Sequence, residues 1–244
     1  MTVLLTSPEF MKKIISATLA TCALSMTQQV HAAGAMNVDD AQLLGAHKCQ
    51  LETWGRFNRG GTERWLMPSC NFTGNLEVAA GGAWQRDAQG MYMSDAQIQA
   101  KTIFKVLETN GYGIGLLAGA NRQTSADDRE RSWNYFAKVP MTLSLRDDDI
   151  LVHANLGLNH VGAEKSTRLT WGLGNETRLL ERLSFIGEVF GESKGKPSYQ
   201  AGVRTVLVPE KIELDLTAGN TFGRDTQGRY VVIGLRFISP EWFR

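Results

Sequence analysis

The sequence predicts an all-β fold, an antiparallel up-and-down transmembrane β-barrel of about 12 strands, with about 10 strands as the alternative. Three observations lead to this prediction: an export signal near the N-terminus, long segments that alternate apolar with polar residues, and connections that alternate in length. Outer-membrane barrels combine such strands with short turns at one end and longer loops at the other.

The export signal begins at Met11. Two lysines are followed by a mostly apolar run over residues 14–26 and then by small residues over 32–35, which is the order of parts in a secretory signal peptide. We interpret residues 1–32 as a signal peptide, in which 1–10 are a spurious N-terminal extension. Its removal takes away two lysines and one glutamate, so the formal net charge changes from +1 to +1 − 2 + 1 = 0. A neutral protein does not indicate a nucleic-acid partner.

The rest of the chain divides into a short N-terminal periplasmic segment, 33–48, and a barrel domain, 49–244. Within the first part, only Val38–Leu44 suggests a short helix. Cys49 and Cys70 are the cysteines left after processing, and an isolated pair in an exported protein predicts a disulfide. A metal site there would need histidine or carboxylate partners at a suitable spacing, which the sequence lacks. We therefore predict no metal and no cofactor.

The clearest strand covers residues 133–145, where apolar residues recur at every second position. This strand is longer than an ordinary globular strand of about 5–6 residues, and it suits a tilted strand that crosses a bilayer with about 9–11 residues. The same alternation predicts twelve strands at 49–57, 62–69, 71–85, 96–108, 111–121, 133–145, 149–161, 166–176, 180–191, 198–208, 211–222 and 229–237.

Tight turns and longer polar connections alternate along the chain. Turn-forming residues predict the tight ones at Asn110-Gly111, at Asp147-Asp148, near Arg178 and at Pro209-Glu210. The longer connections are 86–95, 122–132, 162–165, 192–197 and 223–228. This rhythm is typical of short periplasmic turns and longer external loops. An even barrel whose last strand ends in the periplasm needs both 49–57 and 62–69, although Pro68 in the second of these leaves ten strands open.

Each predicted strand has an apolar face and a charged face. A membrane barrel turns the apolar face to lipid and the charged face to the lumen. The turn at Pro209-Glu210 places Arg204 opposite Asp215, and a final loop over 223–228 would place Arg236 on the other side of Asp215, which predicts one charged cluster. Glu77, Lys101 and Lys105 also face inward, and our lumen-lining candidates for solute binding are Lys138, His153, Asn155, Arg168, Glu188, Arg204, Glu213, Asp215 and Arg236.

The charged cluster has two interpretations. The charges can pair with one another in a narrow lumen, because a lone buried charge is costly. Alternatively, they can line a pore and select anionic or polar solutes. Barrels of about 8 strands are filled by side chains and those of about 16–18 strands hold an open channel, so an intermediate size decides neither.

The C-terminal half, residues 133–237, resembles bacterial outer-membrane barrels of the phenol-degradation (meta-pathway) transporter type. The resemblance rests on LVHANLGLNH (151–160), IGEVFGES (186–193), the strand pair over 199–223 and the closing YVVIGLRF (230–237). It implies a barrel in the bacterial outer membrane and a role in passing small molecules. The closing strand also resembles the aromatic-ended recognition signal of outer-membrane proteins, which implies the barrel-assembly machinery as a partner during biogenesis. Here seven residues follow Phe237.

We therefore expect a passive channel or transporter for a small-molecule solute, surrounded by outer-membrane lipid. The alternatives are a structural barrel with a charge-paired, closed lumen, a barrel hydrolase, and a soluble exported barrel that binds a ligand. A hydrolase needs a nucleophile beside a base and a third group that orients the base. His153 has Asn155 and Thr142 nearby but no serine, so we predict no enzyme activity.

Overall fold

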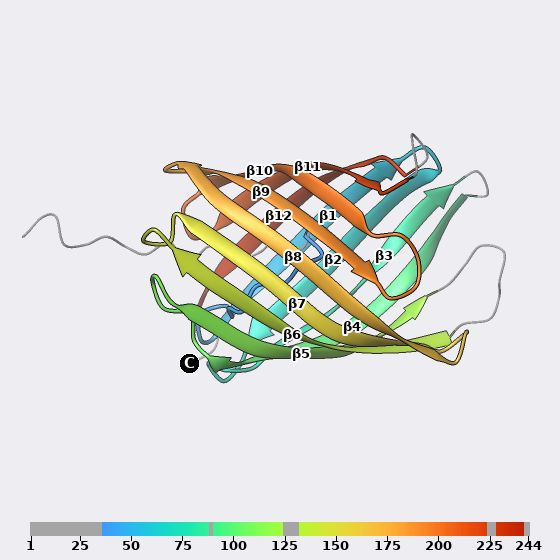
Figure 1. The fold of residues 1–244 in the computed structure, drawn as a ribbon, viewed down its shortest axis with the longest axis horizontal. Coiled ribbons are helices and arrows are strands. Elements are labelled where there is room, and N and C mark those ends of the chain that lie inside the picture. The colour runs from blue at the N-terminus through green and yellow to red at the C-terminus, as the bar shows by residue number, and fades with distance from the viewer. Residues whose placement is uncertain (1–35, 88–89, 124–131, 224–227, 242–244) are drawn as a thin grey trace, which may run out of the picture. The chain divides into compact units, whose positions relative to one another are not determined.

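Twelve antiparallel strands, each hydrogen-bonded to a strand on either side, curve round until the last meets the first (Figure 1). This computed structural model describes residues 36–87, 90–123, 132–223 and 228–241, and the predicted signal peptide lies outside these ranges. The described residues belong to one unit, His31–Arg244. The predicted all-β barrel and its count of twelve strands are confirmed.

The alternating segments of the sequence form these strands. Their bounds are β1 (Lys48–Asn58), β2 (Gly61–Asn71), β3 (Glu77–Asp87), β4 (Gly90–Lys105), β5 (Tyr112–Gln123), β6 (Ser132–Leu145), β7 (Ile150–Val161), β8 (Ser166–Leu180), β9 (Leu183–Glu192), β10 (Ser198–Val208), β11 (Ile212–Thr221) and β12 (Tyr230–Glu241). No helix in the described part of the chain is long and apolar enough to cross a membrane.

Several predicted boundaries are wrong. The turn predicted near Arg178 lies at 181–182, because Arg178 still belongs to β8 and pairs with Ser184 of β9. The predicted strand 71–85 starts too early, because residues 72–76 form a turn in which Gly74 has a φ of +89°, a conformation that suits glycine. The predicted loop 86–95 is mostly strand, since β3 and β4 remain paired as far as Asp87 opposite Gly90. The connection between β3 and β4 is therefore tight rather than long.

The two ends of the barrel carry different connections. One end, called here the turn end, has 146–149, 181–182 and 209–211. The opposite end, called the loop end, includes 162–165 and 193–197.

A glycine lets β10 and β11 approach closely. A Cβ atom at Gly202 would lie only 1.9 Å from the backbone oxygen of Leu216, so a side chain at this position would push the strands apart. Glycine inside a strand commonly marks such a close backbone approach. The register beside it is the predicted one, with Arg204 opposite Asp215.

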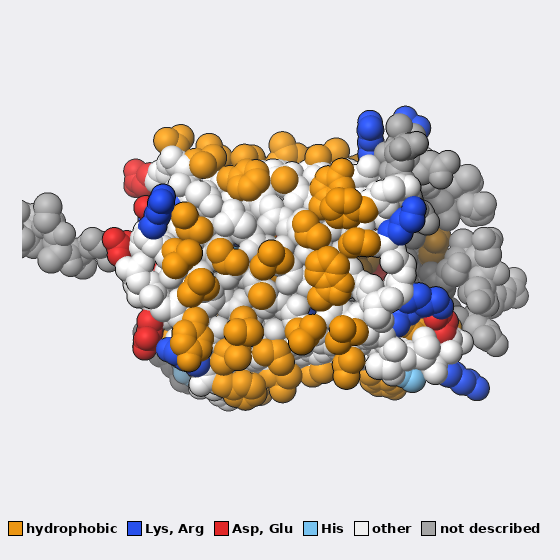
Figure 2. All heavy atoms as spheres, viewed as in Figure 1, with side chains coloured by type: hydrophobic (Ala, Val, Ile, Leu, Met, Phe, Trp, Pro, Cys, Tyr) orange, Lys and Arg blue, Asp and Glu red, His pale blue; other side chains and the backbone are white. Residues whose placement is uncertain are grey.

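The outer wall of the barrel is apolar and its charges point inward. Leu143, Leu173 and Leu216 are 44%, 55% and 47% exposed, whereas Arg204 and Asp215 are 2% and 0% exposed. Figure 2 shows hydrophobic side chains across the visible face, with charged side chains toward its two ends. Such an apolar band between charged rims is the exterior of a barrel that lies in lipid. The predicted facing of the strands, apolar side outward and charged side inward, is confirmed.

β1 is held on both sides. β12 pairs with it along its length, which closes the barrel. On its other side, Cys49 lies opposite Cys70 of β2, and the two form the predicted disulfide. β2 tolerates Pro68 because its pairing with β3 skips that residue, which has no N–H to donate, and continues at Leu66 and Ser69. The alternative of ten strands is therefore wrong.

Candidate functional site

A stretch of chain ahead of β1 lies inside the barrel. Residues 37–44, called here the lumen segment, donate backbone N–H groups to inward-facing side chains. The N–H groups of Asn37 and Val38 donate to the Glu188 carboxylate at 2.9 and 2.8 Å, and that of Asp39 donates to Asn155 Oδ1 at 2.8 Å. Asn155 returns a hydrogen bond of 2.8 Å to the Asp39 carbonyl. The barrel wall thus supplies the partners that this extended backbone needs.

Ion pairs fix the middle of the lumen segment. Asp40, which is 2% exposed, accepts a hydrogen bond of 2.7 Å from Lys101 Nζ on β4. Asp39 pairs with Lys138 on β6. Further along, the Ala41 N–H donates to Thr142 Oγ1 at 2.8 Å. The lumen segment is therefore anchored to opposite parts of the wall rather than to one strand.

The end of the lumen segment is held near the turn end of the barrel. The Leu44 N–H donates to Glu77 at 3.0 Å, and Asn71 Nδ2 donates to the Leu44 carbonyl at 2.6 Å. The short helix suggested for Val38–Leu44 is wrong, since these residues form no helix. Residues 37–44 of the predicted short N-terminal periplasmic segment, 33–48, lie in the lumen.

A second group of charges fills the turn-end half of the lumen. Arg204 Nε and Nη2 donate to the two oxygens of Asp215, each at 2.8 Å, and Nη1 donates to Glu176 at 2.8 Å. This is the bidentate geometry of strong arginine–carboxylate pairs. Glu213 pairs with Arg236. The predicted Arg204–Asp215 contact is present, with Glu176 as an additional partner that the sequence did not indicate.

The predicted place of Arg236 is wrong by two residues. Arg236 lies opposite Glu213, and Asp215 lies opposite Gly234. The prediction assumed a loop over 223–228, but the pairing of β11 with β12 already ends at Gly219 opposite Tyr230. The longer connection moves β12 along β11, and the charged cluster becomes two linked pairs instead of one triad.

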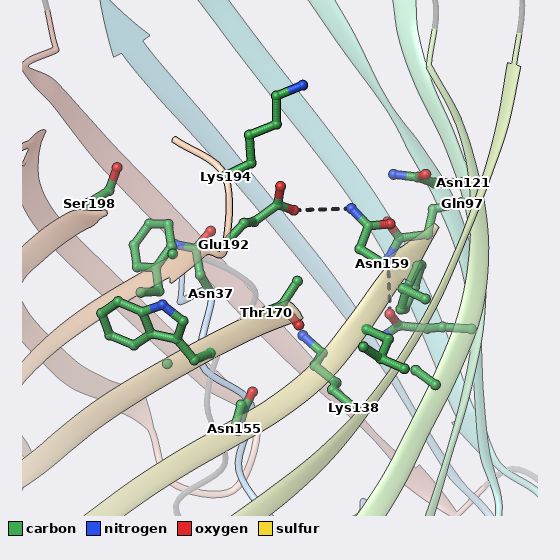
Figure 3. Close-up of a pocket in the computed structure, with 18 of the residues that line it drawn as sticks. Asn37, Gln97, Asn121, Lys138, Asn155, Asn159, Thr170, Glu192, Lys194 and Ser198 are labelled. Carbon is green, nitrogen blue, oxygen red and sulfur yellow. Dashed lines mark hydrogen bonds between the residues drawn. The ribbon is translucent and has the colours of Figure 1, made fainter. Parts of the chain in front are cut away.

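The loop-end half of the lumen contains a polar cavity of about 570 Å³ (Figure 3). Six carboxamides contribute to its lining, from the lumen segment and from β4, β5 and β7: Asn37, Gln97, Gln99, Asn121, Asn155 and Asn159. Thr170 and Ser198 add hydroxyls, and Phe136 and Phe190 add aromatic rings. Lys138, Glu192, Lys194 and Lys196 also line it, so the cavity combines neutral hydrogen-bonding groups, charged groups and apolar surface.

Aromatic side chains occupy another part of the lumen, beside β1, β2 and β12. Trp54 and Trp65 stack with ring centroids 5.2 Å apart and planes 8° from parallel. Trp54 also packs against the buried residues Tyr230 and Val232, and the Arg56 guanidinium lies 4.6 Å from the Tyr230 ring centroid. This cation–π contact and the stacked rings fill the lumen on this side.

The predicted site residues fall into three groups. Lys138 and Asn155 line the cavity and also hold the lumen segment, which Glu188 holds as well. Arg168 pairs with Glu192 at 2.8 Å near the loop end. The remaining ones lie in the turn-end half, away from the cavity lining: His153, Arg204, Glu213, Asp215 and Arg236.

His153 does not form an accessible catalytic site. Its Nδ1 lies 3.0 Å from Thr142 Oγ1, and that oxygen also accepts the Ala41 N–H. His153 and Thr142 are 3% and 1% exposed beneath the lumen segment. Among the described residues, no group of three or more histidine, cysteine, aspartate or glutamate side chains is placed to hold a metal ion.

The fold and the lumen define the class of protein: a twelve-stranded β-barrel of the bacterial outer membrane. The chain belongs to the family described as Uncharacterised conserved protein UCP029691, whose model matches residues 20–237. No curated protein matches the sequence significantly.

Solved structures of outer-membrane barrels resemble the chain over most of its length. The KdgM porin has a TM-score of 0.60 at 11% identity, covering 80% of this chain and 99% of the porin. The NanC porin has a TM-score of 0.57 at 10% identity, with coverage of 78% and 98%. The COG4313 outer-membrane channel from Pseudomonas putida F1 has a TM-score of 0.54 at 11% identity, with coverage of 82% and 97%. At such identities the likeness establishes the fold.

Proposed function

We propose that the chain is a passive outer-membrane channel for small polar solutes, and that its own lumen segment closes it in this conformation. The observation that carries the proposal is the polar cavity of about 570 Å³, whose lining includes Asn37 of the lumen segment. A wall of amides and hydroxyls offers a solute donors and acceptors in place of water. The sequence contains no energy-coupling motif, so passage would follow a concentration gradient.

Opening would require the lumen segment to move. It is held to the barrel by hydrogen bonds with side chains and by two ion pairs, with Lys101 and Lys138, rather than by a strand ladder. The twelve strands pair with one another independently of it. The lumen segment can therefore leave while the wall stays closed, because none of the strand-to-strand hydrogen bonds depends on it.

The structural relatives support a channel for small molecules. Two of them are named porins and one an outer-membrane channel, and one KdgM structure is described as a complex with disordered oligogalacturonate. The resemblance to transporters of the phenol-degradation type supports small-molecule passage as well, and we propose a role of that general kind. We also propose that outer-membrane lipid surrounds the barrel and that the barrel-assembly machinery inserts it, using β12.

Single-channel recording in planar bilayers tests the proposal. Asp40→Asn removes the charge that pairs with Lys101 inside the barrel, which should weaken the lumen segment and raise the open fraction several-fold over that of the unmodified protein. Asp149→Asn is the control, because the Asp149–Arg178 pair lies at the turn end with both partners partly exposed. Equal conductance in all three proteins would contradict closure by the lumen segment.

A second candidate function is a structural barrel with a permanently closed lumen. The buried Arg204–Asp215 and Arg204–Glu176 contacts favour it, because the charges satisfy one another and leave little for a solute. This candidate predicts no conductance from the unmodified protein or from Asp40→Asn at any voltage. The same recordings therefore separate the two functions.

A further inference from the structure

We propose that the lumen cavity is a binding site for an uncharged, hydroxyl-rich solute of one or two sugar rings. This inference rests on the proposed channel function for its biological meaning, and it adds the class of solute. The cavity volume of about 570 Å³ falls in the range of roughly 300–1,000 Å³ that small-molecule sites occupy. The chemistry of the lining selects among solutes of that size.

Carboxamides are the commonest polar side chains of the lining, and they favour hydroxyl groups. Each Asn or Gln side chain offers two N–H donors and an acceptor oxygen. A sugar hydroxyl likewise both donates and accepts, so each can bond to an amide in either direction. Six such amides from four parts of the chain surround one cavity: Asn37, Gln97, Gln99, Asn121, Asn155 and Asn159.

The hydrogen bonds within this lining are exchangeable. Gln97 Nε2 donates to Gln99 Oε1 at 2.9 Å, and Asn159 Nδ2 donates to Glu192 Oε1 at 3.1 Å (Figure 3). Asn121 Oδ1 is buried and has no hydrogen-bond partner among the described residues. A buried acceptor without a partner is destabilising. A ligand hydroxyl, or water in its absence, can supply the missing bond after a small rotation of the amide.

Most charged groups around the cavity pair with an opposite charge, and Lys196, which also lines it, donates to the Gly223 carbonyl at 3.2 Å. Lys138 pairs with Asp39, Arg168 pairs with Glu192 at 2.8 Å, and Lys194 pairs with Glu164 at 2.9 Å. A carboxylate or ammonium group on the solute would have to compete with these protein partners. An uncharged solute avoids that competition, so the lining favours neutral over ionised sugars.

Two aromatic rings add a surface for the apolar face of a sugar. Phe136 and Phe190 both line the cavity. The Phe136 ring lies against Gly119, where a Cβ atom would come within 2.6 Å of Phe136 Cζ. The absence of a side chain at position 119 therefore leaves room for the ring. A pyranose carries its C–H groups on its faces and its hydroxyls round its edge. Rings and amides in one cavity therefore match the two kinds of surface that a sugar presents.

The test uses two sugars that differ in one group. Galactose and galacturonate share the same ring, and galacturonate carries a carboxylate at one position. Binding of each to the full mature protein in detergent is measured by titration calorimetry. We expect galactose to bind at least tenfold more tightly than galacturonate. Tighter binding of galacturonate, or binding of neither sugar, would overturn the proposal.

Two variants locate the binding site. Asn121→Ala should weaken galactose binding at least fivefold, whereas Asn175→Ala, which changes the same residue type outside the cavity lining, should leave it unchanged. Phe136→Leu gives a second site variant that keeps an apolar side chain, and it should also weaken binding. Heat-dependent migration on gels reports whether each barrel is folded. Equal galactose affinity in all folded variants would place the ligand elsewhere and reject the site.

Binding in detergent does not require passage, so the two proposals fail separately. If the protein binds galactose but never conducts, the sugar site is supported and the channel function is rejected. If the protein conducts but binds neither sugar, the channel function is supported and the sugar site is rejected.

Discussion

Arg204 separates carboxylates that would otherwise repel one another inside the barrel. It donates to Asp215 and to Glu176, and Glu213 lies 3.9 Å from its Nε. The arginine is 2% exposed, so solvent screens these charges little. The arginine is the partner common to all three acids, and each acid is only one of its several partners. Loss of the arginine should therefore destabilise the barrel more than loss of any one of the acids.

Arg204→Leu should destabilise the barrel more than Asp215→Asn does. Removing one partner of a buried pair costs about 3–5 kcal/mol, and loss of the arginine also leaves Glu176 and Asp215 close together without a cation. After Asp215→Asn, the Arg204–Glu176 bond persists. Urea unfolding in detergent, followed by tryptophan fluorescence, measures both variants. The reverse order would contradict the assigned pairing.

A control is available at the turn end. Arg178→Leu breaks the Arg178–Asp149 pair, whose side chains are 33% and 53% exposed. Exposed pairs contribute about 0–1 kcal/mol. The expected change in the free energy of unfolding is therefore within about 1 kcal/mol, well below that of Arg204→Leu.

Glu164, in the connection between β7 and β8, gives a prediction for pH. Hydrogen bonds from Arg168 and Lys194 lower the pKa of the Glu164 carboxyl to about 2. A lowered folded-state pKa means that the stabilising contribution is present above the usual glutamate pKa and is lost as the pH falls toward 2. The cluster should stay ionised at pH 4. The side-chain carboxyl chemical shift of Glu164 should report this, and Arg168→Gln should raise the pKa toward its usual value.

At the scale of elements, β8 and the lumen segment touch through a pair of glycines. A Cβ atom at Gly172 would lie 2.6 Å from Val38 Cγ2, whereas one at Gly174 would lie 3.4 Å from the nearest Val38 atoms. A side chain at position 172 would force Val38 or β8 to shift, whereas one at position 174 would make an ordinary van der Waals contact with Val38. The two positions face the same residue of the lumen segment, so they form a matched pair.

Gly172→Ala should displace the lumen segment, and Gly174→Ala should not. Overpacking of this kind costs about 1–3 kcal/mol, and movement of Val38 away from β8 would relieve it. We expect Gly172→Ala to raise the open fraction in planar bilayers relative to Gly174→Ala. Identical recordings from the two variants would mean that Val38 adjusts within the closed state.

The sequence predicts strands better than it predicts the contents of the lumen. Alternation fixes which side of each strand is apolar, and the two-residue turn chemistry at Pro209-Glu210 fixes the register of Arg204 with Asp215. The register of β12 was missed because the length of the preceding loop cannot be read from alternation. A short turn with recognisable turn residues fixes the register of the two strands that it joins, whereas a longer connection without such residues does not.

The lumen segment was missed for a different reason. Its partners are distant in sequence: Glu188 is 150 residues from Val38 and Thr142 is 101 residues from Ala41. A short extended stretch has no periodicity that would reveal a buried role. One signal was available: inward-facing Lys138 has Gly157 and Leu117 as its cross-strand neighbours, so its acid had to come from elsewhere. Asp39 and Asp40 are the nearest acids ahead of the barrel.

At the scale of the whole molecule, the disulfide ties the first two strands together at one end. It closes a loop with a sequence separation of 21, for which chain entropy predicts about 3 kcal/mol of stabilisation. The double variant with Cys49→Ser and Cys70→Ser should therefore unfold at lower urea concentration. It should still form a complete barrel, because β1 keeps its pairing with β2 and β12. Failure to form the barrel would show that the bridge is needed for assembly.

The joint between β1 and β12 also constrains the order of assembly. Residues 37–44 precede β1 in the chain, yet they lie inside the closed barrel of twelve strands, and Leu51 pairs with Phe237 where β1 meets β12. Once the last-made strand has bonded to the first, the wall admits nothing from the side. These residues can enter the lumen from the side only before β1 and β12 pair. After that, they can enter or leave only along the barrel axis, through one of its two ends.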